Sequence, residues 1–453
     1  MGKQGAGHVV AIVGGAVAGA EAARIFADRG VVSVVFEQNS RPYGKIEDGL
    51  PRWHAKLRKK EYDAINARLG RPQVQFVPDT KIGRDIEFPA LVGDWGFTAV
   101  LLAVGAWRDR PLAIAGADAY VGRGLIYQNA FIYWFNHYAE KGYAGPRYEP
   151  VDGAIVVGGG LASIDVVKVL QIETVRRALA TRGITEDVLR LEYDGIRPVL
   201  EAHDLTWESL GLEGATLFYR RRIEDMPLVP MPSGADVTRR EKVQSTRRRI
   251  LEKAMRKYLF RVRPEMVPVG LVVQGASLAG LRFQRTRIEE GRAVGIPDAF
   301  EDVRAPLVVS SIGSVPEPMR GIPQDGALYR FADHELGRLE GYDTVFSVGN
   351  VVTGKGNILD SRAHSIEVTG QLVECFLGVA EADHAGEQAL LDLKLSDADQ
   401  TAVAMATWLE NRPPLSGVEI TRLLERVRER QRAVGYEGDY CSWITRVTPP
   451  NLA

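Results

Sequence analysis

Cysteine is scarce in this chain, with two residues among 453. Cys375 and Cys441 form no Cys-x-x-Cys pair, which excludes both a disulfide framework and a dithiol redox motif. This cysteine usage fits a reducing compartment, so we expect two inert thiols and a cytoplasmic location.

An excess of one charge and long apolar runs are missing as well. The 57 basic and 58 acidic residues leave a net charge of −1, which excludes bulk nucleic-acid binding. No apolar run approaches the roughly 18 residues that cross a bilayer. Strand-forming sequence begins close to Met1, so we expect neither a signal peptide nor a membrane association.

Glycine is abundant, with 47 residues, and it gathers in two strand–turn–helix patterns. In the first, the apolar run 8–13 leads into residues 14–19. A dinucleotide-binding turn needs a first glycine for its tight geometry, a second position that lets backbone approach a pyrophosphate, and a third that packs helix on strand. Gly14 and Gly19 fill the first and third positions. Ala16 stands at the second position, where its Cβ leaves less room between the backbone and a pyrophosphate.

The next strand indicates which nucleotide this turn binds. The apolar run 31–36 ends in Glu37, about 20 residues after the glycines, where a carboxylate accepts ribose hydroxyls. Because a carboxylate repels a 2′-phosphate, the pattern predicts FAD or NAD and excludes NADP. The structural alternative is a plain strand–turn–helix.

The second glycine pattern lies mid-chain. The apolar run 154–157 is followed by Gly158 and Gly160, with Leu161 opening a helix and Ser163 at the packing position. The pattern again predicts a dinucleotide-binding turn.

Arginines follow the strand that comes after this second turn. Residues 216–219 lead into Arg220, Arg221 and Arg222, and guanidinium groups suit a 2′-phosphate through bidentate hydrogen bonds. The turn is therefore predicted to bind NADPH; the alternative is three solvated arginines. Roughly 60 residues separate Gly158 from these arginines, so we expect a helical insert within 175–214.

Together these motifs resemble the adrenodoxin-type NADPH:ferredoxin reductases and, less closely, the small subunit of glutamate synthase. The resemblance runs over nearly the whole chain. Segments 41–44 and 49–51 are similar to the family's flavin-contacting segment, with Lys45 where the family usually has Leu. Residues 104–106 resemble a strand end that closes the first FAD segment, and 310–313 resemble the return crossing between domains. Residues 344–350 and 354–358 resemble the strand and helix start that close the FAD site.

The motifs and the resemblance give the expected cofactor contacts. His54 falls where the adrenodoxin type carries a histidine near the flavin, which implies a polar group at the nicotinamide; the alternative is a structural histidine. No metal ligands are expected. The expected FAD contacts are Gly14, Ala16, Gly19, Glu37, Gly44, Lys45, Gly105, Gly349, Asn350, Gly356, Asn357 and Ile358, and the expected NADPH contacts are Gly158, Gly160, Leu161, Ser163, Arg220 and Arg221.

The order of the motifs predicts an α/β fold with two Rossmann-like, doubly wound domains. An NADPH-binding domain, residues 116–334, is expected to be inserted into a discontinuous FAD-binding domain, residues 1–115 and 335–453. The nicotinamide would then reach the flavin across the cleft between the two domains.

The expected activity is hydride transfer from NADPH to FAD, followed by electron transfer to a ferredoxin-like iron–sulfur protein. Residues 52–60 and 239–263 are strongly basic, and they are either docking surfaces for an acidic ferredoxin or solvated helix faces. One alternative is an electron-input subunit bound to a larger partner subunit, as in glutamate synthase. Two others are a non-catalytic nucleotide-binding redox sensor and a flavin monooxygenase.

Overall fold

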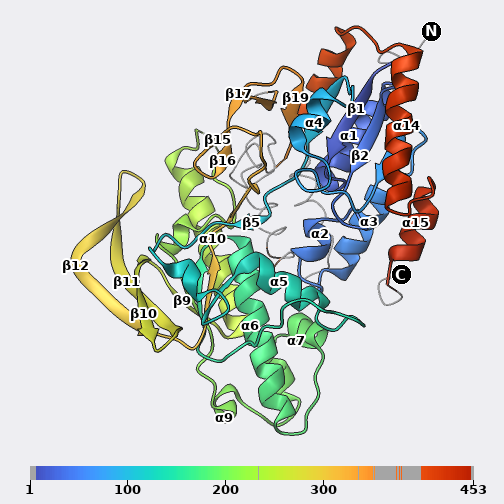
Figure 1. Cartoon of the computed structure of the whole chain (residues 1–453). Helices are drawn as coiled ribbons and strands as arrows, with labels where there is room; N and C mark the ends of the chain where they lie inside the picture. The colour runs from blue at the N-terminus through green and yellow to red at the C-terminus, as the bar shows by residue number, and fades with distance from the viewer. Residues whose placement is uncertain are drawn as a thin grey trace.

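The computed structural model of the chain contains two largely parallel sheets joined by a short ribbon (Figure 1). It describes residues 7–232, 234–334, 336–349, 351, 374, 377, 379 and 399–449. The two largely parallel sheets and their covering helices confirm the α/β class predicted from the sequence. Among the described helices, none is both long and apolar enough to cross a bilayer.

The first sheet has seven strands in the order β17-β18-β19-β4-β1-β2-β3. Its parallel part pairs β1 with β2 on one side and β4 on the other, so the carboxyl end of β1 lies where the strand order reverses. The strands are β1 (Val9–Val13), β2 (Val32–Phe36), β3 (Val74–Val77), β4 (Ala99–Leu102), β17 (Phe331–Asp333), β18 (Arg338–Leu339) and β19 (Val345–Ser347).

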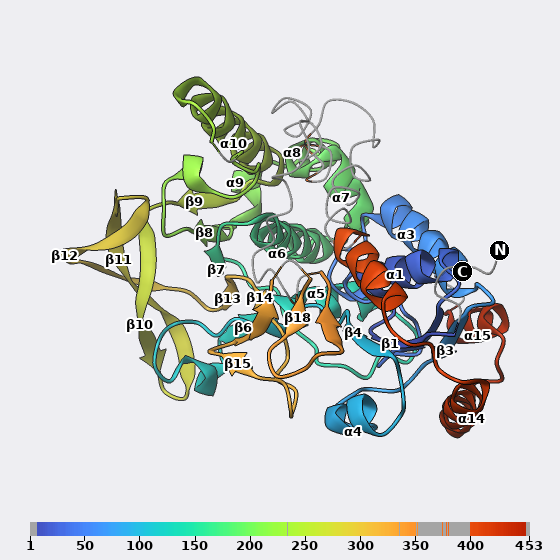
Figure 2. The same ribbon diagram turned by 90° about the horizontal axis from the view of Figure 1, so that it is seen from above.

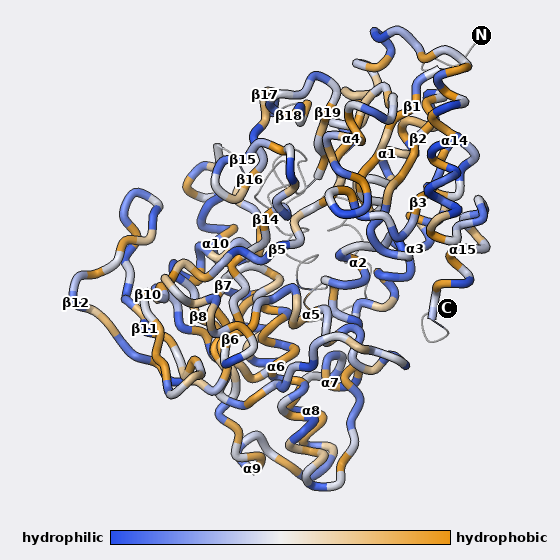
Figure 3. Tube along the Cα trace, viewed as in Figure 1, coloured by the Kyte–Doolittle hydropathy of each residue, from blue (hydrophilic) through white to orange (hydrophobic). Residues whose placement is uncertain are grey.

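Both faces of this sheet are covered, which explains why its central strands read as continuous apolar runs. In β1, Val10 and Ile12 pack into one core, whereas Val9, Ala11 and Val13 pack into another. The first core lies under α1 (Val17–Asp28), α3 (Ala55–Leu69), a helix at 399–410 and α15 (Tyr440–Val447), and the second under α4 (Phe88–Gly93) and α14 (Gly417–Ala433). Figure 3 shows these strands as mainly hydrophobic and α14 as largely hydrophilic on its outer side.

The second sheet has five parallel strands in the order β6-β13-β7-β8-β9. Helices cover one face, and a three-stranded antiparallel sheet packs on the other and extends away from the body of the molecule (Figure 2). The parallel strands are β6 (Leu125–Tyr127), β7 (Ile155–Gly158), β8 (Thr216–Phe218), β9 (Arg261–Arg263) and β13 (Val308–Ser311). The antiparallel strands are β10 (Met266–Gln274), β11 (Ser277–Glu289) and β12 (Arg292–Arg304).

The helices that cover one face of the five-stranded parallel sheet, opposite the antiparallel strands, are α5 (Gln128–His137), α6 (Leu161–Ala180) and α10 (Val237–Tyr258). The predicted insert between α6 and β8 contains three short helices. These are α7 (Val188–Asp194), α8 (Ile196–Glu201) and α9 (Trp207–Leu210).

The chain crosses between the sheets on two antiparallel strands, β5 (Arg108–Asp109) outward and β14 (Ser314–Val315) on return. The first sheet therefore draws its strands from residues 9–102 and 331–347, and the second from residues 125–311. The domain limits at 115/116 and 334/335 stay a prediction. The remaining short elements are α2 (Lys45–Asp48), β15 (Gln324–Asp325), β16 (Leu328–Tyr329) and the 3-10 turns η1 (Ala117–Tyr120) and η2 (Ile223–Asp225).

Candidate dinucleotide-binding sites

The first glycine turn connects β1 to α1, and two of its positions are closely packed. Gly14 has a φ of +102°, and a Cβ there would lie 2.6 Å from the carbonyl oxygen of Ala103. A Cβ on Gly19 would lie 1.9 Å from the carbonyl oxygen of Gly14. These two glycines therefore let β1, β4 and α1 approach closely, as the sequence pattern predicts.

Ala16 occupies the N-cap position of α1, where no side chain caps the helix. Its methyl group faces Gly44, because a Cβ built on Gly44 would lie 2.8 Å from the Cβ of Ala16. Gly44 also has a φ of +52°, which favours glycine. The extra methyl group at the second position of the turn is thus accommodated by a glycine opposite it, and the helix N-terminus keeps free N–H groups for an anion.

Glu37 follows β2 and points toward this turn, with 4% of its surface exposed. Its Oε2 accepts a hydrogen bond from the Gly15 N–H at 2.8 Å, and its Oε1 accepts one from the Asn39 N–H at 3.0 Å. Burial raises the pKa of Glu37 to about 7, although these backbone N–H groups favour the charged form. The carboxylate is held by the turn itself, which suits a ribose-binding role.

A cleft opens beside this turn. One wall consists of Gly14, Ala16, Glu37 and Gly44. The opposite wall comes from residues that the sequence analysis missed, because no local motif marks them and the return crossing brings them here from far along the chain. They are Glu317, Met319 and Tyr329.

Gly349 follows β19 and has a φ of +77°. A Cβ on Gly349 would lie 3.3 Å from the Cβ of Ala18, so the end of this strand packs on the first turn of α1. Gly105, with a φ of +65°, follows β4 near Trp107. The other predicted contacts in this part, Asn350, Gly356, Asn357 and Ile358, lie outside the described residues.

The second glycine turn connects β7 to α6, and its positions have different surroundings. A Cβ on Gly158 would lie 2.2 Å from the Ser311 carbonyl oxygen, to which the Ser163 hydroxyl donates at 3.0 Å. A Cβ on Gly160 would meet no atom within 4 Å. Gly158 and Ser163 therefore pack the helix on the sheet, while Gly160 faces open space at the uncapped start of α6, where Leu161 begins.

Three arginines after β8 are held in different ways. Arg222 is committed to Asp225, with its Nε 3.0 Å from the carboxylate, and Arg221 lies 3.5 Å from the same group. The Nε of Arg221 is buried with no hydrogen-bond partner, which is costly unless a ligand supplies one. Arg220 is exposed. The guanidinium group of Arg220 and the Nε of Arg221 are thus left for an anion, and these two arginines are the ones that the sequence predicts.

Arg247 on α10 supports this segment and was missed by the sequence analysis. Its Nε donates to the Val229 carbonyl oxygen at 2.6 Å, and a second nitrogen donates to the Glu224 carbonyl oxygen at 3.0 Å. Burial lowers the pKa of this guanidinium. The residue lies in the basic stretch 239–263, so charge alone did not distinguish its role from that of its exposed neighbours.

No family model matches the chain. It is 22% identical over 442 residues to the mitochondrial NADPH:adrenodoxin oxidoreductase of Arabidopsis thaliana, covering 89% of this chain and 88% of that protein. It is 24% identical to the NADPH-ferredoxin reductase FprA of Mycobacterium leprae, covering 90% of each. The solved structure of Mycobacterium tuberculosis FprA in complex with NADPH shares the fold, with a TM-score of 0.60, 18% identity and coverage of 94% and 90%. The chain is thus similar, over about nine-tenths of its length, to reductases named for adrenodoxin and ferredoxin.

A shorter match links the chain to glutamate synthase, in line with the resemblance noted in the sequence. The small chain of the Bacillus subtilis enzyme is 31% identical over 171 residues, which are 36% of this chain and 33% of that protein.

Lys45, at the position where the adrenodoxin type usually has Leu, points toward the ribbon between the sheets. Its Nζ donates to Asn129 Oδ1 at 3.1 Å and to Ser314 Oγ at 3.2 Å, and it lies 5.7 Å from the centre of the Trp107 ring. Burial lowers the pKa of Lys45 to about 8, although Asp109 favours the charged form. The side chain therefore connects α2 to α5 and to β14.

His54 is 2% exposed and precedes α3. It lies beside Trp53. The Nζ of the buried Lys168 of α6 lies 4.7 Å from the centre of the Trp53 ring. Burial acts to raise the pKa of Glu192, but Lys168 and, more weakly, His54 lower it overall. His54 is thus buried beside Trp53, which contacts α6 of the other half of the molecule, and its role at a nicotinamide stays a prediction.

Proposed function

We propose that this chain is an NADPH-dependent flavoprotein reductase that passes electrons to a ferredoxin-like iron–sulfur protein. The observation that carries the proposal is the difference between its two glycine turns. A buried carboxylate, Glu37, is bonded to the first turn, and Arg221 presents an unpartnered buried N–H beside the second. One turn therefore disfavours a 2′-phosphate and the other favours one.

The residues of the first site fit FAD. The uncapped start of α1 offers N–H groups to a pyrophosphate, and Glu37 offers its carboxylate to the ribose of the adenosine half. The bound flavin would supply the chemistry, accepting a hydride and releasing electrons singly. The chain would position that cofactor, with Gly14, Ala16, Gly19, Gly44, Gly105 and Gly349 keeping the backbone close to it.

The residues of the second site fit NADPH. Gly160 leaves the start of α6 open to a pyrophosphate, and Arg220 and Arg221 are placed for the 2′-phosphate. Because the two sheets are joined by the β5–β14 ribbon, the nicotinamide would extend from the second turn toward the flavin, with His54 as a candidate neighbour.

An acidic iron–sulfur protein is the proposed acceptor. Two relatives that match about nine-tenths of the chain are named for adrenodoxin and ferredoxin. Helix α10 offers a basic surface, because six of its cationic side chains are exposed. They are Arg239, Arg240, Lys242, Arg248, Arg249 and Arg256.

The basic stretch 52–60 contributes less to such a surface. Arg58 is buried and donates to the Glu47 carbonyl oxygen, and Arg52 stacks on the rings of Phe135 and Tyr138. In that stretch Lys56, Lys59 and Lys60 are exposed.

An electron-input subunit is the second candidate, and the match to the glutamate synthase small chain favours it. In that case a larger partner subunit replaces the free ferredoxin. Co-purification of one stoichiometric large subunit from the source cells would favour this candidate over the first.

The proposal is tested on the purified chain in the absence of oxygen. We expect a yellow protein, or one that becomes yellow when supplied with FAD, whose flavin absorbance bleaches with NADPH much faster than with NADH. Reduced protein should then reduce ferredoxins. A protein that cannot be reconstituted with FAD refutes the FAD assignment, and equal bleaching by NADH refutes the assignment of Arg220 and Arg221.

A further inference from the structure

The wall of the cofactor cleft opposite the glycine turn is built by the chain on its way back from the second sheet. We call residues 316–329 the return segment. Glu317, Met319 and Tyr329 of this segment line the same cleft as Ala16 and Glu37. Nothing in the sequence pattern or in the proposed function gives this segment a role.

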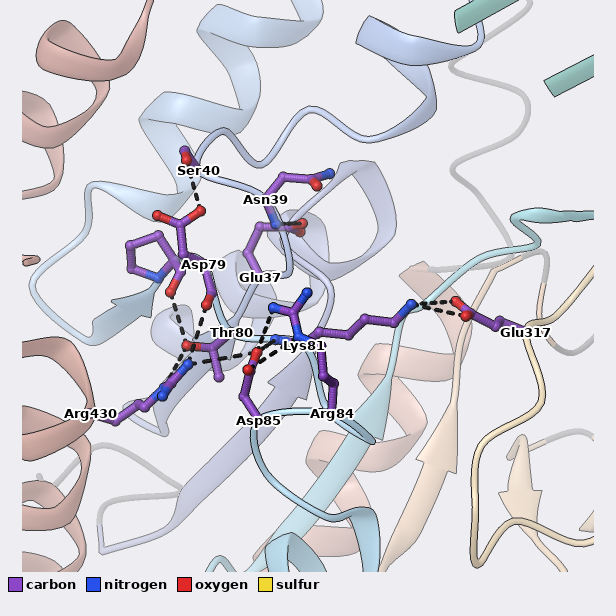
Figure 4. A network of polar contacts seen from close by, with 11 residues as sticks. Glu37, Asn39, Ser40, Asp79, Thr80, Lys81, Arg84, Asp85, Glu317 and Arg430 are labelled. Carbon is purple, nitrogen blue, oxygen red and sulfur yellow. Dashed lines mark hydrogen bonds and ion pairs between the residues drawn. The ribbon is translucent and has the colours of Figure 1, made fainter. Parts of the chain in front are cut away.

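The loop at 78–86, which faces the return segment, is fixed by hydrogen bonds to α14, to Glu37 and within the loop. Arg430 of α14 donates to Thr80 Oγ1 at 2.9 Å and to the Asp79 carbonyl oxygen at 3.3 Å (Figure 4). The Lys81 N–H donates to Asp85 Oδ2 at 2.8 Å, and the Thr80 N–H donates to the Glu37 carbonyl oxygen at 2.8 Å. This loop is therefore a fixed edge of the cleft.

One ion pair joins this fixed loop to the return segment across the cleft. The Nζ of Lys81 lies 2.9 Å from Oε1 and 2.8 Å from Oε2 of Glu317 (Figure 4). Both side chains reach solvent, with exposed fractions of 33% and 52%. The return segment is also anchored by the Tyr329 hydroxyl, which donates to the Glu317 carbonyl oxygen at 2.7 Å.

The residues beside this ion pair suit a flat apolar ring. Ile82 and Tyr329 are buried, at 3% and 4% exposed, and they line the cleft together with Met319. Because Glu37 would take the ribose of the adenosine half, the adenine of the same nucleotide would lie next to these side chains. The ion pair thus spans the cleft where the adenosine would enter and leave.

We propose that the Lys81–Glu317 ion pair closes the return segment over the adenosine end of the FAD site and so controls how fast FAD leaves. This inference rests on the FAD assignment in the proposed function. An exposed ion pair is weak, so neutralising it should speed release by only about 1.5–5-fold. Reversing one charge adds repulsion, so the increase should reach roughly 5–20-fold.

The test compares FAD release from the loaded full-length chain, followed as the recovery of flavin fluorescence after dilution. The variants are Lys81→Glu, Glu317→Lys and the double variant with both changes. We expect each single variant to release FAD faster and the double variant to return to within about twofold of the original rate, because the pair is restored with reversed charges. Raising the salt from about 0.05 to 0.5 M should speed release from the unchanged chain, since salt screens exposed charges.

A matched control is available on the antiparallel sheet of the second half. Arg282 and Asp302 also form a two-contact exposed pair, at 2.6 and 3.0 Å, with side chains 55% and 47% exposed. Arg282→Glu and Asp302→Arg should leave FAD release unchanged.

The outcomes separate this inference from the proposed function. If the unchanged chain cannot hold FAD, the proposed function fails and the inference fails with it. If FAD binds but the Glu317→Lys variant releases it at the original rate, the inference alone is overturned. If Lys81→Glu speeds release and the double variant does not recover, Lys81 acts on the cofactor directly rather than through Glu317, which also overturns it.

Discussion

At the scale of single residues, we expect the charge of Glu37 to govern which nucleotide the first glycine turn binds. The carboxylate is buried, and its pKa is raised to about 7 because burial disfavours the charged form. Since the folded protein binds this proton more tightly than the unfolded chain, Glu37 contributes less to stability as the pH rises from 4.5 through about 7. A ligand whose hydroxyl groups donate hydrogen bonds to the charged carboxylate offsets that loss of stability.

FAD affinity is therefore expected to increase as the pH rises through about 7, as Glu37 becomes charged. Glu37→Gln should weaken FAD binding by about 10–100-fold at pH 8, the value of a charge-assisted hydrogen bond, and should flatten the pH dependence. Titration of the apoprotein with FAD at several pH values measures both. Asp63→Asn, at an exposed carboxylate of α3, is the control. An unchanged pH dependence in Glu37→Gln would show that another group titrates.

The three arginines after β8 differ in which protein groups already pair with them, so their replacement by alanine should have different effects on NADPH binding. Arg221→Ala should weaken NADPH binding by about 10–100-fold and NADH binding by less than about threefold, because a 2′-phosphate contact is lost. Arg222→Ala is the matched control, since Asp225 already holds that guanidinium. Equilibrium titration with each nucleotide provides the comparison. Equal losses in both variants would argue against a selective role for Arg221.

At the scale of structural elements, the glycines of one turn have separable functions. Gly158 lies against the Ser311 carbonyl oxygen, where a methyl group has no room, whereas the Cβ position of Gly160 is open. The first glycine lets α6 pack on the sheet, and the second leaves the start of that helix accessible.

Gly158→Ala should therefore lower the free energy of unfolding by about 1–3 kcal/mol or more, because backbone atoms must move. Gly160→Ala should change it by less than about 0.5 kcal/mol, yet weaken NADPH binding at least about tenfold by crowding the pyrophosphate. Denaturant unfolding and NADPH titration of both variants separate the two effects. The idea fails if Gly160→Ala binds NADPH normally.

At the scale of the whole molecule, the two halves are connected by buried polar contacts as well as by the ribbon. Lys45 of α2 reaches Asn129 of α5 and Ser314 of β14. His137 of α5 lies between Asp48 at 3.0 Å and Glu140 at 2.8 Å; burial acts to lower its pKa, but these carboxylates raise it overall. The segment that resembles the family's flavin contact is thus held by a helix of the other half.

Lys45 gives this connection a pH dependence. Because burial lowers its pKa from 10.5 to about 8, the folded chain binds this proton more weakly than the unfolded chain, and stability should rise between pH 8 and 10.5. The gain is on the order of 1.4 kcal/mol per pH unit. Lys45→Met should stabilise the chain at pH 7 and remove this rise, whereas Lys59→Met, at an exposed position, should do neither. Urea unfolding between pH 7 and 10 tests both statements.

Much of the site could be predicted because its requirements are local. The turns at Gly14 and Gly158 combine an apolar strand with glycines where backbone atoms touch, and both needs are visible in a short stretch of sequence. Glu37 and Arg221 follow at the ends of the neighbouring strands, where parallel pairing brings them beside the turns.

The sequence by itself therefore determined the two turns, the α/β class and the opposite charge preferences, since these depend on neighbours along the chain and on strand order. Only the tertiary structure decided how Asp225 pairs with the arginines after β8, where Lys45 points, and which residues close the cleft. Glu317, Met319 and Arg430 meet the first site across hundreds of residues, through packing and pairing that no local pattern encodes. Their positions follow from how the return segment and α14 pack, which depends on the folded shape as a whole.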